Sequence, residues 1–116
     1  QQLAANAVQL AENPGARGIV VITRRGLMAD YITSCHPQKA RVFAFTNDSQ
    51  TRRRLMLNRN VSPIRSAFSQ DPEKTLATAF NLLIRRGEIA SGDKVVVISD
   101  ILAGAGIDAI QIRLVP

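Results

Sequence analysis

A short, wholly apolar run that ends abruptly in a basic turn constrains the fold of this 116-residue chain more than any other feature. The run is Ile19-Val20-Val21-Ile22, and the turn is Thr23-Arg24-Arg25-Gly26. Consecutive β-branched residues are typical of a strand buried on both faces, as in parallel sheets covered by helices. A polar turn between such a strand and a helix can form an anion site, because glycine permits close backbone approach and the first helical N–H groups are free. The stretch alone leaves a second interpretation open, an ordinary loop with solvated arginines.

The same order of strand, polar turn and helix recurs along the chain. Apolar runs predict strands at residues 18–22, 41–46, 61–64 and 94–98. Helical spacing predicts a first helix that contains Leu3 and Ala11, and Asn13-Pro14-Gly15 ends it. Further helices are expected over residues 28–35 and 52–57, the latter with N-cap oxygens available from Asn47-Asp48-Ser49. Asp71-Pro72-Glu73 predicts the start of the last helix, and Gly87 its end.

Side-chain spacing also predicts which faces are buried. Met28, Tyr31, Ile32 and Cys35 recur at helical spacing and are expected to share one buried face. Leu76, Ala79, Phe80 and Leu83 form the expected buried stripe of the last helix. Pro63 places the third strand at a sheet edge, because proline cannot donate to the ladder.

The segment between the last two strands decides the fold class. Residues 99–107 are too few for the helical crossover that a parallel neighbour needs, so residues 109–115 should run antiparallel. We therefore expect a single domain over residues 1–116, an α/β fold built as a three-layer α/β/α sandwich with a mostly parallel sheet. In the last strand Ile110, Ile112 and Leu114 alternate with Gln111 and Arg113, which predicts one buried face and an edge that can meet another subunit.

Composition limits the classes of function. The net charge is +6, but the arginines fall in short groups and there is one tyrosine and no tryptophan, so solvated or anion-binding surface fits better than a nucleic-acid surface. One cysteine excludes an internal disulfide and fits a reducing compartment. The apolar runs are too short to cross a bilayer, so no membrane association is expected. Gln1 is no natural initiator, and we expect the chain to be a piece of a longer protein.

The expected ligand site lies beyond the carboxyl ends of the parallel strands. Residues 23–26 would bound it on one side and the loop with Asp100, Gly104 and Gly106 on the other. Neither a Walker phosphate loop nor a complete dinucleotide fingerprint occurs, and no serine has a nucleophile elbow or an evident base, so no catalytic residue is assigned. Asp100 and Asp108 fit solvated caps better than metal ligands, so no metal site is expected.

Over its whole length the chain resembles the C-terminal domain of pyruvate kinase. The resemblance rests on the order and spacing of several short motifs: Val20-Val21-Ile22-Thr23-Arg24-Arg25-Gly26, Phe43-Ala44-Phe45-Thr46-Asn47, Thr51-Arg52-Arg53-Arg54-Leu55 and Gly92-Asp93-Lys94-Val95-Val96-Val97. Gly26-Leu27-Met28-Ala29 and Phe45-Thr46-Asn47 are most similar to plastid and cyanobacterial-type members.

The resemblance implies a five-stranded sheet in the order 3-2-1-4-5 with the last strand antiparallel. It also implies that the catalytic groups and the magnesium and potassium ions of the parent enzyme belong to a separate barrel domain, absent from these residues. The domain itself would need no cofactor. It would bind a phosphorylated small-molecule effector and contact the barrel domain and other subunits of a homo-oligomer.

The effector site carries over only in part. Thr23, basic Arg24 and Gly26 match the family's phosphate loop, whereas Arg25, Leu27 and Met28 depart from it. The loss of hydroxyl donors there makes fructose 1,6-bisphosphate only one of several compatible effectors. The candidate effector residues are thus Thr23, Arg24, Arg25, Gly26, Asp100, Gly104 and Gly106, and the candidate interface residues are Ile110, Ile112 and Leu114.

Two other functions stay open at this point. The chain could act alone as a phosphometabolite sensor or as a scaffold that pairs through its terminal strand. Alternatively it could be a nucleic-acid-binding module, whose affinity would fall steeply with salt and ignore sugar identity. A cytoplasmic location is expected, or a plastid location if the parent enzyme is a plastid protein.

Overall fold

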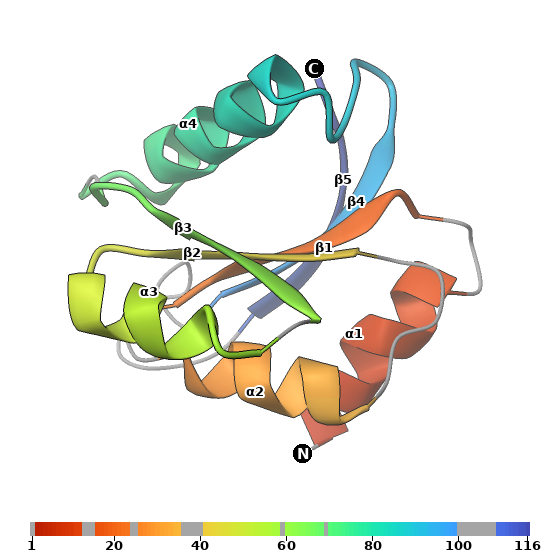
Figure 1. Cartoon of the computed structure of the whole chain (residues 1–116). Coiled ribbons are helices and arrows are strands. Elements are labelled where there is room, and N and C mark those ends of the chain that lie inside the picture. Colours follow the sequence, from red (N-terminus) through yellow and green to blue (C-terminus); the bar gives the residue numbers. More distant parts are fainter. Residues whose placement is uncertain are drawn as a thin grey trace.

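Five strands form one sheet, and helices cover both of its faces (Figure 1). The structure is a computed structural model, and it describes residues 2–12, 16–23, 26–35, 41–58, 60–68, 70–99 and 109–116. The helices are α1 (Gln2–Glu12), α2 (Leu27–Ser34), α3 (Ser49–Leu55) and α4 (Pro72–Arg85), and the strands are β1 (Gly18–Ile22), β2 (Arg41–Thr46), β3 (Val61–Arg65), β4 (Lys94–Ser99) and β5 (Ala109–Leu114).

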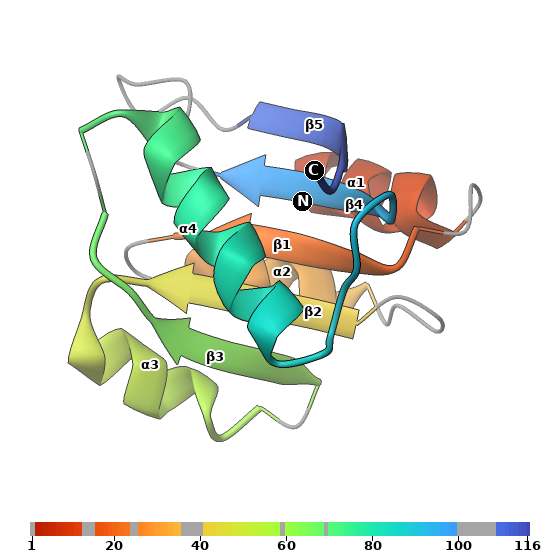
Figure 2. The same cartoon turned by 90° about the horizontal axis from the view of Figure 1, so that it is seen from above.

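The strand order is β3-β2-β1-β4-β5 (Figure 2), as the family resemblance implied. The first four strands are parallel, with Val20 of β1 paired to Phe43 of β2 and Val97 of β4. Only β5 runs antiparallel, with Ile112 opposite Val96. The predicted three-layer α/β/α sandwich is therefore confirmed, and β3, which contains Pro63, lies at the sheet edge as expected.

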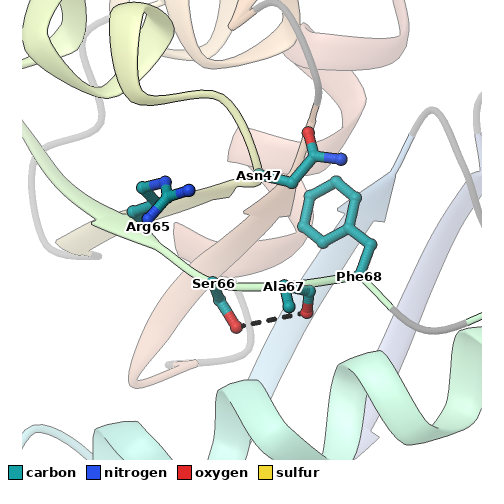
Figure 3. Close-up of a pocket in the computed structure, with 5 residues that line it drawn as sticks. All are labelled: Asn47, Arg65, Ser66, Ala67 and Phe68. Carbon is teal, nitrogen blue, oxygen red and sulfur yellow. Dashed lines mark hydrogen bonds between the residues drawn. The ribbon is translucent and has the colours of Figure 1, made fainter.

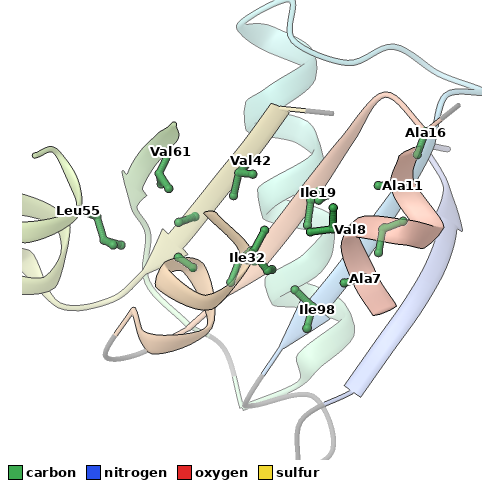
Figure 4. Packing of buried hydrophobic residues seen from close by; sticks show 14 residues of the cluster. Ala7, Val8, Ala11, Ala16, Ile19, Ile32, Val42, Leu55, Val61 and Ile98 are labelled. Carbon is green, nitrogen blue, oxygen red and sulfur yellow. The ribbon is translucent and has the colours of Figure 1, made fainter. Parts of the chain in front are cut away.

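The two faces of the sheet are covered unequally. Helices α1, α2 and α3 lie on one face, and α4 alone covers the other (Figures 1 and 2). On the first face Ala7, Ala11 and Ile32 pack with Ile19 and Ile98 in a core built largely of small and β-branched side chains (Figure 4). On the second face the α4 stripe of Leu76, Ala79, Phe80 and Leu83 packs against Val20, Phe43, Phe45, Ile64 and Val97. The predicted stripe of α4 is confirmed.

Local signals set the starts of α3 and α4. The Asp48 carboxylate accepts a hydrogen bond from the Thr51 amide, and the Asp71 carboxylate accepts one from the Glu73 amide. Pro72 stands at the first helical position, where its missing N–H has no intrahelical partner to lose. Beyond α4, Gly87 adopts φ of 74°, which suits glycine at a helix C-terminus.

Two predictions about buried faces were confirmed only in part, because Ile32 is buried and Cys35 and Ile110 pack against the core but other members of the two faces are exposed. Tyr31 is 42% exposed, because α2 turns Ala29, Ile32 and Thr33 toward the core instead. Ala29 is small enough to pack closely on this face. Thr33 can be buried there because its hydroxyl donates hydrogen bonds to backbone carbonyls of α2 itself. In β5, Ile112 and Leu114 are 49% and 67% exposed, whereas Ile110 of the same face is partly buried against the core.

Candidate functional site

The carboxyl ends of the four parallel strands meet at one edge of the sheet, where open α/β sheets place ligands. Ile22 at the end of β1 is paired with Phe45 of β2 and with Ser99 of β4, and Phe45 is paired with Ile64 of β3. Three buried hydroxyl side chains, Thr23, Thr46 and Ser99, lie at the ends of the three central strands. That these three side chains are all buried follows from the strand register and the packing, which the sequence pattern does not specify.

The turn after β1 is held by its own hydroxyl residue. Thr23 continues the pairing with β2 through its amide, which donates to the Phe45 carbonyl at 2.9 Å. Its Oγ1 accepts a hydrogen bond from the Gly26 amide at 3.0 Å. Gly26 precedes α2 as its N-cap with φ of 83°, in the left-handed region that favours glycine. The Gly26 N–H is therefore bonded within the turn and stabilises it.

Arg54 of α3 lies against this turn, although sequence reasoning did not assign it to the site. A Cβ atom at Gly26 would stand 2.5 Å from Arg54 Nη2, so the glycine also makes room for the guanidinium. Arg54 Nη1 donates to Asp30 Oδ2 at 2.9 Å, which ties α3 to the first turn of α2. Both side chains are partly exposed, so the cation stands at the surface next to the positive end of α2.

The structure places only part of the predicted effector site. Thr23 and Gly26 lie together at the carboxyl end of β1, as expected. Arg24, Arg25, Asp100, Gly104 and Gly106 lie outside the described residues. The described part of the site therefore consists of Thr23, Gly26 and Arg54. The run of three arginines at residues 52–54 was visible in the sequence, but nothing in it indicated which arginine would face α2.

A second feature of this edge is a half-open cavity at the ends of β2 and β3. Its volume is about 380 Å³, and Asn47, Arg65, Ser66, Ala67 and Phe68 line it (Figure 3). The Ser66 amide donates to the Thr46 carbonyl at 2.9 Å, so the pairing of β2 and β3 continues up to the cavity. Nearby, hydrogen bonds from Thr51, its hydroxyl above all, lower the pKa of Asp48, and Arg65 adds an electrostatic contribution in the same direction.

The described residues contain no group of three or more His, Cys, Asp or Glu side chains arranged to hold a metal ion. Within the same residues, none of the helices has the length and apolar character needed to span a membrane. The accessible groups at this edge are the N-terminus of α2 and guanidinium groups, which suit an oxyanion, whereas the three hydroxyl side chains are buried.

Fold and site together define an open-sheet α/β domain with an anion-compatible turn at the carboxyl edge of its parallel strands. A family model described as "Pyruvate kinase, alpha/beta domain" matches residues 1–112. The chain belongs to this family.

Curated relatives with similar sequences are plant plastid enzymes. The chain is 37% identical over 116 residues to pyruvate kinase isozyme A, chloroplastic, of Ricinus communis, and 36% identical over 116 residues to the isozyme of the same name of Nicotiana tabacum. Both alignments include 100% of this chain but only 19% and 18% of the relatives. The chain thus spans about a fifth of the length of these enzymes.

Solved structures confirm the fold. A pyruvate kinase from Cryptosporidium parvum matches with a TM-score of 0.87 at 24% identity, over 99% of this chain and 22% of that one. The C. parvum enzyme in complex with ADP matches with a TM-score of 0.88 at 23% identity, over 99% of this chain and 23% of that one. The family model and the curated relatives confirm the predicted family, and the sheet confirms the predicted strand order.

Proposed function

We propose that this chain is the regulatory and oligomerisation domain of a pyruvate kinase, the enzyme that converts phosphoenolpyruvate and ADP into pyruvate and ATP. In this proposal a phosphorylated effector binds between the Thr23–Gly26 turn and the loop that contains Asp100, Gly104 and Gly106. The catalytic residues, with the magnesium and potassium ions, belong to a barrel domain outside these residues. Family membership supports the assignment to this enzyme.

The observation that carries the effector proposal is the geometry of the Thr23–Gly26 turn. The turn stands at the carboxyl end of a central parallel strand and leads into α2, so the N-terminus of α2, the positive end of its dipole, lies at this edge of the sheet. Arg54 adds a third basic side chain to the two in the turn. Because charge-assisted hydrogen bonds to phosphate are the strong ones, this combination favours a phosphorylated ligand over a neutral one.

Calorimetric titration of the chain with a panel of phosphorylated sugars tests this function. Saturable binding that depends on the sugar is expected, and Arg24→Ala, Arg25→Ala or Arg54→Ala should weaken it about tenfold or more, since each removes a hydrogen bond to a charged acceptor. The matched control is Arg86→Ala, an exposed arginine at the end of α4. Absence of binding across the panel contradicts an effector site in this chain and leaves assembly as its role.

The same titration distinguishes binding of a phosphorylated effector from binding of nucleic acid. Binding to phosphate groups along a nucleic acid weakens steeply as salt is raised and does not depend on the identity of one sugar. An effector pocket discriminates between sugars of equal charge, because it must satisfy their hydroxyl groups. Equal binding to every phosphorylated compound, with a steep salt dependence, would favour the nucleic-acid alternative.

The assembly role is proposed from the outer edge of β5. This strand pairs with β4 on one side only, and Ile112 and Leu114 expose apolar surface beside that edge. An unpaired edge with apolar side chains favours addition of another strand, and a second copy of the same edge would form a symmetric contact. We propose that Ile110, Ile112 and Leu114 contribute to contact with another subunit.

The names of the similar plant enzymes bear on the cellular location of the parent protein. The Ricinus communis and Nicotiana tabacum enzymes are described as chloroplastic. We propose a plastid-type enzyme as the parent protein, with a cytoplasmic location as the alternative.

A further inference from the structure

The amino ends of the parallel strands, at the opposite end of the sheet from the turn after β1, carry basic side chains. Gly18 of β1 is paired with Arg41 of β2 and with Val95 of β4, so the residues that begin these strands lie side by side. The Arg17 amide donates to the Lys94 carbonyl at 2.7 Å, which holds Arg17 next to the first residue of β4. Arg17, Arg41 and Lys94 therefore stand together where the three central strands begin.

The end of α4 adds two arginines to this group. The helix runs back over the sheet and ends near the amino ends of the strands (Figure 2), and Arg85 and Arg86 are exposed there. Two residues further on, the Glu88 carboxylate accepts a hydrogen bond from Arg41 Nη1, and the Glu88 carbonyl accepts one from Arg17 Nε at 3.3 Å. These contacts join the end of α4 to the strands in one basic patch, which consists of Arg17, Arg41, Arg85, Arg86 and Lys94.

The acidic side chains near the basic patch leave most of its charge exposed. Asp93 Oδ2 accepts from the Ala90 amide at 2.8 Å, so this carboxylate is engaged in the turn before β4. Glu12 ends α1, which lies on the opposite face of the sheet from α4 (Figure 1). Glu88 is the acid that contacts the arginines, yet the side chain of its partner Arg41 is still 61% exposed. The Arg41 guanidinium can therefore pair with a further carboxylate from solvent.

Arg41 is held in position by its own strand. Its guanidinium carbon lies 5.4 Å from the centre of the Phe43 ring, which is itself buried. Gly18 of β1 makes room for that ring, because a Cβ atom there would stand 2.9 Å from Phe43 Cε2. A guanidinium that is fixed by a ring and by Glu88 loses little conformational freedom on binding, so Arg41 suits the recognition of a carboxylate.

We propose that the basic patch is a docking surface for an acidic protein segment. A second copy of this chain is a poor occupant, because each copy carries a net charge of +6. Nucleic acid fits less well, because Glu88 would repel a phosphate backbone and the buried ring of Phe43 cannot stack on a base. The proposal does not rest on the effector site, which lies at the carboxyl ends of the strands.

The test is fluorescence anisotropy of a short, labelled oligoglutamate peptide titrated with the chain at low salt. The double variant Arg17→Gln with Arg41→Gln should bind the peptide about tenfold more weakly, since each exposed charge pair contributes a factor of about three. The charge-matched control is Arg52→Gln with Arg53→Gln, two exposed arginines of α3 on the opposite face of the sheet from α4. This control should change the affinity by less than about twofold.

Glu88→Gln separates docking from a structural role of the same arginines. The amide keeps the shape of the side chain and an oxygen that can accept from Arg41, but it removes the charge that competes with the peptide. We therefore expect Glu88→Gln to bind the peptide about threefold more tightly. If the arginines served only to join β2 to the end of α4, this variant would lower the free energy of unfolding and leave peptide binding unchanged, which would contradict the proposal.

Three further results would overturn it. Equal weakening in the two double variants would show that the peptide responds to net charge alone. Binding of an oligothymidylate of equal charge at least as tight as that of the peptide, and lost in the Arg17 and Arg41 double variant, would make the patch a nucleic-acid surface. No peptide binding at millimolar concentration, with thermal melts showing the chain folded, would exclude the docking surface.

Discussion

Two independent constraints act on Gly26. Its φ of 83° lies in the left-handed region, and a Cβ atom there would meet Arg54 Nη2 at 2.5 Å, Thr51 Cγ2 at 3.2 Å and Leu55 Cδ1 at 3.3 Å. The first constraint is local and the second comes from a helix that begins more than twenty residues later. The turn that opens α2 is therefore fixed by its own backbone and by the packing of α3.

We expect Gly26→Ala to destabilise the chain by more than the backbone strain alone. Left-handed geometry costs a residue with a side chain about 1–2 kcal/mol, and the contact with Arg54 adds to it. Gly87→Ala is the matched control, with φ of 74° and no atom within 4 Å of the new Cβ. Urea unfolding should show a larger loss for Gly26→Ala, and a smaller one when Arg54→Ala is also present. Equal losses of stability in Gly26→Ala and Gly87→Ala would contradict a steric contribution from the contact with Arg54.

The pair of Glu73 and Arg113 makes stability depend on pH. Two hydrogen bonds from the Arg113 guanidinium, at 2.6 and 3.0 Å, lower the pKa of Glu73 below its usual value. Near this pKa the folded chain then binds fewer protons than the unfolded chain. The stabilisation that the pair gives the folded chain is therefore present above the usual glutamate pKa of about 4.3, and it is lost as pH falls through the lowered pKa of Glu73.

We expect Glu73→Gln and Arg113→Gln to make the free energy of unfolding less dependent on pH below about pH 5. Each variant removes one member of the pair. The unfolding free energy, measured with urea from about pH 3 to pH 7, should therefore change with pH by a similar amount in both variants. The Glu73 side chain is largely exposed, so high salt should reduce the difference from the unmodified chain. An unchanged slope in both variants would contradict this role for the pair.

At the scale of elements, α4 alone covers one face of the sheet. Its buried stripe meets side chains from β1, β2, β3 and β4, whereas the opposite face is shared among three helices. The capped N-terminus, the first-turn proline and Gly87 set the ends of this helix, and the apolar stripe sets its rotation. Damage to the stripe therefore affects packing over several strands at once.

We expect Leu83→Ala to destabilise the chain by about 2–5 kcal/mol, the usual range for a buried leucine. Leu83 is fully buried, and the truncated side chain would leave a cavity over the sheet. The neighbouring Ile84 is 37% exposed, so Ile84→Ala should cost about 1 kcal/mol or less. Thermal unfolding of the two variants compares the two faces of one helix. A similar loss for both would contradict the packing of α4 described here.

At the scale of the whole molecule, the sheet has two unlike edges. The β3 edge carries Pro63, which cannot donate to an added strand. The β5 edge carries Ile112 and Leu114, both exposed. Edge strands are normally protected by proline or charge, so the unprotected edge favours contact with another subunit.

We expect the chain to self-associate through β5 and Ile112→Lys to weaken the association at least about tenfold. Lysine would place a charge in the apolar contact. In an isologous contact each of the two subunits would contribute one such charge. Sedimentation over a range of concentrations measures the effect. Leu57→Lys is the control, because Leu57 is 85% exposed at the end of α3, away from β5. A chain that stays monomeric at millimolar concentration, or that dissociates equally in both variants, would contradict this interface.

The local signals in the sequence determined the elements, the sandwich class and the antiparallel last strand. Asp48 and Asp71 cap helices at the predicted places, and the short segment after β4 excluded a crossover. These features depend on residues a few positions apart, so they can be read from the chain directly. The family motifs also implied the strand order, which the structure confirms.

Only the tertiary structure decided how distant segments meet. Arg54 against Gly26, the row of Thr23, Thr46 and Ser99, and the cavity of Arg65 and Phe68 each join residues from different strands or helices. Periodicity alone placed Tyr31 in the core and predicted a buried apolar face on β5, but Tyr31, Ile112 and Leu114 are exposed and Ile110 is only partly buried. Helical spacing defines a set of candidate faces, but the rotation of a helix and the coverage of an edge strand follow from packing against neighbours that local sequence does not specify.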